Sequence, residues 1–237
     1  GMWDEALDAA AQVPEERRLE ATTVSLLSSA LEIQIHRGEL DDARHLLATY
    51  APFSESKDLQ DRSMYLSGSA TLARAEGRLD DAVAAGVEAA EISRKKAGEA
   101  SQAVKQGLVE AIEAALALGD TARATELVES IEAVPPGLRS PYLSAQARRF
   151  RARLAADDEA ASEAFADAAT RFRALGVVFW LAVTQLEHGE WLAARGRSDE
   201  AEPLLAEAAE TFERLEATPW LERVEAARGV AEPAPAG

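Results

Sequence analysis

The sequence predicts an all-α protein, a right-handed α-solenoid in which helical hairpins of about 40 residues stack one after another. Three observations lead to this fold class. Apolar residues make up 47% of the chain but aromatic residues only 5%, so Ala and Leu supply most of the core, as suits close helix packing. A short motif recurs along the chain. Apolar residues follow a helical period, and alternation of period two is nowhere sustained.

The recurring motif is a turn, usually glycine with acidic residues, followed by an alanine. It reads GELDDA at 38–43, GRLDDA at 77–82 and GRSDEA at 196–201, with looser copies GDTARA at 119–124 and ADDEAA at 156–161. The alanines, separated by 39, 42, 37 and 40 residues, are Ala43, Ala82, Ala124, Ala161 and Ala201. Glycine permits a positive φ, acidic residues suit the start of a helix, and alanine lets helices approach. Each unit therefore predicts a helical hairpin.

The helical period then places each element in order. In 79–90, for example, small or apolar residues recur at i, i+3, i+4, i+7, i+8 and i+11, which is one helical face. Helices are expected at 3–12, 18–37, 40–50, 58–76, 79–97, 100–118, 121–132, 141–155, 158–174, 179–195, 198–215 and 219–228. Loops are expected at 51–56, 134–141 and 215–219. The last two units align without a gap at an offset of 40, so that Phe172 matches Phe212 and Trp180 matches Trp220.

One continuous array is expected over 1–228, followed by a flexible tail at 229–237. Its units are a partial repeat at 1–17, repeats at about 18–57, 58–98, 99–138, 139–177 and 178–218, and a closing helix at 219–228. The opening GMWDEALDAA matches the second half of a unit, because Gly1 and Ala6 have the spacing of Gly38 and Ala43. We therefore expect the array to begin before the given sequence, with Gly1 either native or a tag remnant.

The pattern resembles tetratricopeptide repeats (TPR). The positions of the last unit that fall on the family's signature spacing are Gly189, Leu192, Gly196, Ala201 and Ala208. The chain departs from the family in its step of about 40 residues, where 34 is usual. Most of its first helices also lack the aromatic and glycine signature. The resemblance implies a TPR-like array whose first helices line a concave binding surface.

A narrower resemblance concerns residues 179–227. This stretch is similar to the C-terminal end of large bacterial class III adenylate/guanylate cyclases and of ATP-binding LuxR-type regulators. The matching residues are Phe212, Glu213, Arg214, Leu215, Ala217, Pro219, Trp220, Glu222 and Arg223. The Ala/Pro tail that follows favours a cyclase-like parent, or a chain trimmed before a DNA-binding domain. The resemblance implies an interaction or regulatory module of a signalling protein, whose partner is a protein or another domain of the parent chain.

The composition of the chain disfavours or excludes several other classes of function. A net charge of −17 disfavours nucleic acid and anionic membrane surfaces. The longest apolar run, 174–183, is half the length of a membrane span. The chain has no cysteine, which excludes disulfides and thiolate sites and suits a cytoplasmic location. No phosphate-binding loop or nucleophile elbow occurs. We expect no enzyme activity in this segment, no cofactor and no catalytic residue.

The histidines and the paired carboxylates have structural interpretations. His36, His45 and His188 form no pair at i, i+3 or i, i+4, so we expect no metal site. Carboxylate pairs such as Asp41–Asp42 recur at one repeat position, where they favour the dipole of a starting helix rather than acid–base chemistry.

The most basic stretch, ARRFRARLAA at 147–156, has two interpretations. Its arginines, Arg148, Arg149, Arg151 and Arg153, would share one helix and could read a carboxylate or phosphate, as in a small-molecule effector. Alternatively, they form a solvated face paired with the acidic segment 157–167. Three aromatic residues of first helices are further groove candidates: Tyr65, Tyr142 and Trp191.

Overall fold

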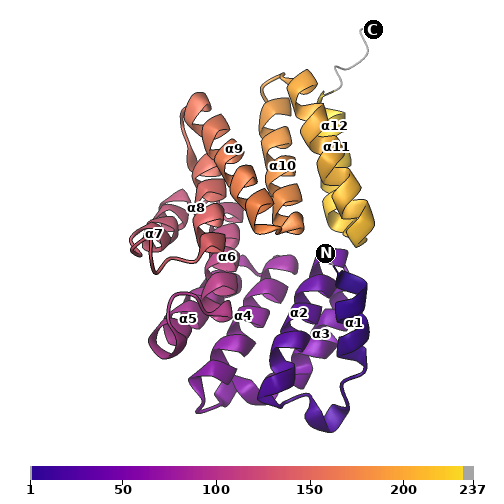
Figure 1. Ribbon diagram of the computed structural model, residues 1–237, viewed down its shortest axis with the longest axis vertical. Helices are drawn as coiled ribbons and strands as arrows, with labels where there is room; N and C mark the ends of the chain where they lie inside the picture. The colour runs from indigo at the N-terminus through magenta and orange to yellow at the C-terminus, as the bar shows by residue number, and fades with distance from the viewer. Residues whose placement is uncertain (1, 232–237) are drawn as a thin grey trace. The chain divides into compact units, whose positions relative to one another are not determined.

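The computed structural model describes residues 2–231, and side chains within that range except those of 21–23, 230 and 231. Among the described residues the secondary structure is helical and no strand occurs (Figure 1). This confirms the prediction of an all-α protein. Of the predicted flexible tail at 229–237, residues 229–231 instead belong to the last helix, and residues 232–237 lie outside the described residues.

Twelve α-helices and two short 3₁₀ helices make up the described chain. They are α1 (Trp3–Ala11), η1 (Glu15–Arg17), α2 (Ala21–Arg37), α3 (Leu40–Thr49), η2 (Ala51–Glu55), α4 (Leu59–Ala75), α5 (Leu79–Ala97), α6 (Gln102–Ala117), α7 (Thr121–Glu132), α8 (Pro141–Leu154), α9 (Asp158–Leu175), α10 (Val178–Ala193), α11 (Ser198–Leu215) and α12 (Thr218–Ala231). Every α-helix coincides with a predicted one, and no end differs by more than three residues. The helical period of the sequence was therefore a sound guide to these elements.

The largest differences from the prediction occur at three places. Helix α2 begins at Ala21 rather than at residue 18, because the chain after Pro14 first forms η1. The expected loop at 51–56 contains η2, which turns Phe53 into the core at 8% exposure. Helix α12 continues to Ala231, beyond the expected end at 228.

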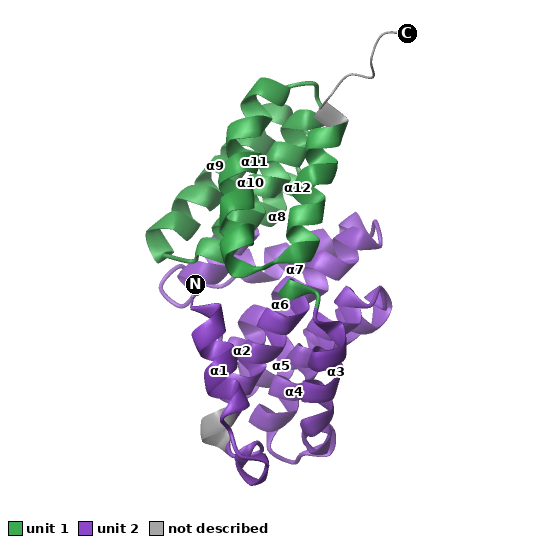
Figure 2. Cartoon of the chain, turned by 90° about the vertical axis from the view of Figure 1, so that its right-hand side faces the viewer, with its two compact units in different colours: residues 1, 36–38, 148–237 green, residues 2–35, 39–147 purple. Residues whose placement is uncertain are grey.

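The helices gather into two compact units (Figure 2). Of the described residues, unit 1 contains 36–38 and 148–231, and unit 2 contains 2–35 and 39–147. The sequence predicts a single array over 1–228, whose repeat boundaries stay a prediction. Each unit is therefore described by itself.

The turns that follow α2, α4, α6 and α10 share one geometry. Their glycines, Gly38, Gly77, Gly119 and Gly196, all have φ between 70° and 87°. The residue after each glycine donates its backbone N–H to the carbonyl five residues earlier, at 2.8–3.0 Å. This is the Schellman arrangement, in which the residue of positive φ is usually glycine. The predicted role of the motif glycines as helix-ending turn residues is confirmed.

The motif alanines are among the most buried residues of the chain. The exposed fraction is 1% for Ala161 and 0% for Ala43, Ala82, Ala124 and Ala201. In unit 2, Ala82 of α5 packs with Ala73 of α4 and Ala114 of α6. A larger side chain at these positions would push the helices apart.

Glu216 is the one residue other than glycine with a positive φ, 56°, in the part of the chain that the structure describes. It ends α11 as Gly176, 40 residues earlier, ends α9. We expect Glu216→Gly to raise the free energy of unfolding by about 1 kcal/mol, because a side chain in the left-handed region costs roughly that much. Chemical denaturation followed by circular dichroism measures the change.

Glu216→Gln is the control, since it removes the charge that lies 3.3 Å from Arg37 but keeps the backbone strain. The Glu216 side chain is 70% exposed, so this ion pair should contribute little. The interpretation fails if the Gly variant is no more stable than the Gln variant.

Candidate functional site

The predicted groove and anion-binding residues do not gather into one site. The four arginines lie on α8 and Trp191 on α10, all in unit 1, whereas Tyr65 and Tyr142 lie on α4 and α8 in unit 2. Each group is described in its own unit.

Arg149 is the most deeply buried charged side chain among the described residues. Its exposed fraction is 0%, and its guanidinium carbon lies 4.4 Å from the ring centroid of Phe150 and 4.7 Å from that of Trp180. The Nε atom is 3.6 Å from Oε2 of Glu187, which α10 brings alongside α8. Two aromatic faces and a carboxylate thus replace the solvent around this cation. Arg149 does not stand on a solvated face.

The other arginines of α8 are less buried than Arg149. Arg148 is half-exposed, and its Nε donates to Oδ2 of Asp167 at 2.6 Å, as the solvated-face interpretation expects. Arg153 donates from Nη1 to Oε1 of Glu187 at 3.0 Å, and Arg151 is partly buried near the end of the helix. Glu187 therefore lies between two arginines and supplies the negative charge that an anionic ligand would otherwise bring.

The three aromatic candidates are half-buried and have protein partners. Trp191 stacks under Arg195, whose guanidinium carbon is 4.1 Å from the ring centroid. The hydroxyl of Tyr142 accepts a hydrogen bond from Nε2 of Gln146 at 2.9 Å. Tyr65 packs against the core of unit 2 around Phe53. Each keeps a partly exposed ring on a first helix, which is the feature that the groove interpretation needs.

Two of the three histidines, His36 and His188, occupy packed positions, whereas His45 is exposed. Within unit 1, the ring of His36 lies 4.3 Å from that of Phe179, and the ring of His188 stacks 5.0 Å from that of Phe165. Burial lowers the pKa of His188, the charge of Arg197 lowers it further, and Glu200 opposes the change. The described side chains contain no group of three or more His, Asp or Glu suited to hold a metal ion.

Buried polar residues concentrate on the first helices of the predicted hairpins, α2, α4, α6, α8 and α10. They are His36, Ser63, Ser67, Thr71, Gln106, Glu110, Gln146, Arg149, Thr184, Gln185 and Glu187. Several join consecutive first helices, as where Nε2 of Gln106 donates to Oγ1 of Thr71 at 3.1 Å in unit 2. Polar residues on an otherwise apolar helix were the signal in the sequence, but their partners were not predictable from it.

A carboxylate of unit 2 shows the effect of this polar packing. Burial raises the pKa of Glu32, on α2, to about 8; Glu110 raises it as well, and Lys105 opposes. Glu110 itself is 2% exposed and receives the guanidinium of Arg74. This environment favours the protonated form of Glu32, which can donate as well as accept a hydrogen bond.

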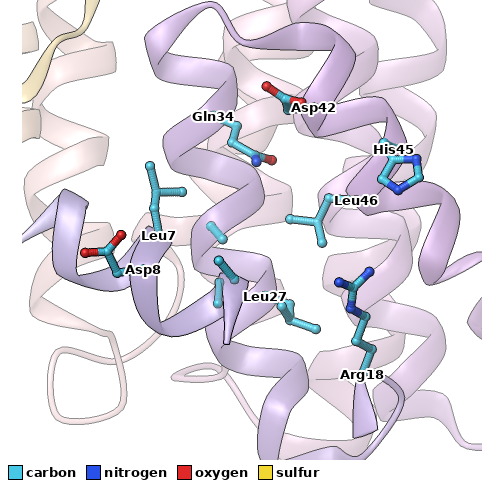
Figure 3. Close-up of a pocket in the computed structure, with 11 residues that line it drawn as sticks. Leu7, Asp8, Arg18, Leu27, Gln34, Asp42, His45 and Leu46 are labelled. Atoms are coloured by element: carbon cyan, nitrogen blue, oxygen red, sulfur yellow. The ribbon is translucent and has the colours of Figure 1, made fainter. Parts of the chain in front are cut away.

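A pocket of about 340 Å³ opens in unit 2 between α1, α2 and α3 (Figure 3). Its apolar lining comes from leucines and alanines of all three helices: Leu7, Ala10, Ala11, Leu27, Ala30 and Leu46. The polar lining residues are Asp8, Arg18, Gln34, Asp42 and His45. Arg18 and Gln34 stand at opposite ends of the pocket with Leu46 between them. This pocket was not predicted, since it depends on how three separate helices pack against one another.

The fold and these sites define an all-helical protein whose buried polar residues concentrate on α2, α4, α6, α8 and α10, with a pocket of appreciable volume in unit 2. No helix of the described residues combines the length and the apolar character needed to cross a membrane. No family model and no curated protein sequence matches the chain. Among solved structures, it is similar to BtubC (BKLC) from P. vanneervenii, with 20% sequence identity and a TM-score of 0.56, over 100% of this chain and 96% of that one. At this identity the likeness concerns the fold.

Proposed function

We propose that the chain is a TPR-like array, a right-handed α-solenoid of hairpins about 40 residues long, that binds a protein segment within a larger bacterial signalling protein. The main support for the proposal is that the same turn and alanine positions recur along the chain. Turn glycines of the same φ and alanines exposed by no more than 1% stand at the motif positions. Such arrays present extended surfaces that usually bind other proteins.

The first-helix face is the proposed contact surface. Partly exposed aromatic residues, such as Tyr65 and Tyr142, stand on these helices. Aromatic residues are enriched at protein interfaces. A net charge of −17 favours a partner segment rich in Lys or Arg.

The proposed parent is a cyclase- or ATPase-type regulator. The support is the C-terminal ending from Phe212 to Arg223, which is similar to the end of such proteins. In that setting the partner segment belongs either to a separate protein or to an upstream domain of the same chain. No catalytic role is assigned to the residues described here.

Site-specific photo-crosslinking tests the contact surface. Benzoylphenylalanine would replace Tyr65 or Tyr142 in the full-length parent protein, expressed in its own host. We expect a discrete cross-linked product from each position, identified by mass spectrometry as one basic segment. Replacing the Lys and Arg residues of that segment should abolish the product.

Glu163 of α9 is the matched control position, since it is exposed on a second helix. The proposal is contradicted if Glu163 yields the same products as Tyr65 and Tyr142, or if the first-helix positions yield none.

A further inference from the structure

We propose that the pocket between α1, α2 and α3 binds a small zwitterion with an apolar body, of about the size of a dipeptide. Its carboxylate would lie at Arg18, and its ammonium group at Gln34 and Asp42. The volume of about 340 Å³ lies within the range of small-molecule sites in proteins. The inference goes beyond the proposed function, because it concerns other residues and another class of ligand.

The middle of the pocket selects an apolar body. Leu27 and Ala30 of α2 form a floor that is 1% exposed. Leu46 of α3 points into the space from the side. A ligand that covers the partly exposed Leu7 and Leu46 removes apolar surface from water, which is the main source of affinity in such pockets.

The Gln34 end selects a hydrogen-bond donor. Its Oε1 atom is buried, and no donor of the described structure reaches it. A buried acceptor without a donor is costly, so a ligand N–H in the pocket would be favoured there. Asp42, which begins α3 beside this end, supplies a negative charge. An ammonium group satisfies both residues.

The opposite end selects a carboxylate. The guanidinium of Arg18 points into the pocket below Leu46. A guanidinium matches the two oxygens of a carboxylate, and the imidazole of His45 lies on the same wall. The two ends thus present opposite charges across an apolar middle, which is the order of groups in a zwitterionic peptide rather than in a simple anion or cation.

Isothermal titration calorimetry of the full chain with leucyl-leucine tests the proposal. We expect the free dipeptide to bind and both blocked forms, N-acetyl-leucyl-leucine and leucyl-leucine amide, to bind about tenfold more weakly or worse, because each loses one charged contact. Absence of binding by leucyl-leucine and by a panel of other apolar dipeptides at millimolar concentration overturns the proposal. So does equal binding of the free and blocked forms.

Matched variants locate the site. Arg18→Gln and Asp42→Asn should each weaken binding about tenfold, whereas their exposed neighbours should have no effect when changed in the same way, as Arg17→Gln and Asp41→Asn. Arg17 pairs on the surface with Glu20, and the Asp41 side chain is 97% exposed. Leu46→Trp, which fills the pocket, should abolish binding. These substitutions should leave the core of the fold intact. If neither Arg18→Gln nor Asp42→Asn changes the affinity, the dipeptide binds elsewhere and the assignment is overturned.

Discussion

Gly107→Ala is expected to lower the free energy of unfolding of unit 2 by about 2–3 kcal/mol. A Cβ atom on Gly107 of α6 would lie 2.5 Å from the carbonyl oxygen of Gly86 on α5, and one on Gly86 would lie 2.4 Å from the oxygen of Gly107. These obstacles are backbone atoms, so no side chain can rotate away and the helices must separate. Urea denaturation followed by circular dichroism at the helical band measures the loss.

Gly229→Ala is the control for helix propensity, because nothing lies within 4 Å of a Cβ at that helical position. It should be neutral or stabilise by up to about 1 kcal/mol. The double variant with Gly86→Ala should cost less than the sum of the two single changes, since helices already separated accept the second methyl group more easily. A Gly107 variant as stable as the original chain would contradict the close backbone contact.

Arg149→Ala is expected to lower the free energy of unfolding by about 3–5 kcal/mol. The change removes a fully buried cation from between the rings of Phe150 and Trp180, and Glu187 loses one of its two arginines. Both a cavity and a poorly compensated buried carboxylate result. Urea denaturation followed by tryptophan fluorescence is a suitable measurement because Trp180 contacts the guanidinium directly.

Arg148→Ala, one residue away, should cost less than about 1 kcal/mol, since its ion pair with Asp167 is solvated. The combined variant Arg149→Met/Glu187→Gln should recover part of the loss, because it removes the buried charge together with its partner. If Arg149→Ala were no more damaging than Arg148→Ala, the buried side chain would have no structural role. A measured loss for Arg149→Ala also means that this variant alone is a poor probe of anion binding.

Much of the local structure followed from the sequence. The twelve helices were predictable because the apolar period and the motif turns are properties of neighbouring residues. The burial of Ala43 and Ala201 followed from the same pattern, since a small residue that recurs one turn into a helix indicates a close approach of helices. Tertiary contacts rarely change the secondary structure of a segment whose helical pattern extends along its whole length.

The site residues were less predictable. Arg149 and Arg153 lie four residues apart and share one side of α8, but this spacing did not show that the side meets a carboxylate. In the structure, α10 places Glu187 beside these two arginines, and α9 places Asp167 beside Arg148. Glu32 likewise looks ordinary in the sequence, and its raised pKa depends on burial and on Glu110 from a distant helix.

The helical class, the positions of the helices and the turns that end them could be predicted from the sequence, because they depend on interactions within about five residues. The burial of polar side chains, the pairing of charges and the position of a pocket became known from the three-dimensional structure. Those properties arise from side chains on different elements, as with Arg18, Gln34 and Asp42 at the pocket. Each of these properties depends on how the helices pack, and packing brings together side chains that a local sequence pattern cannot pair.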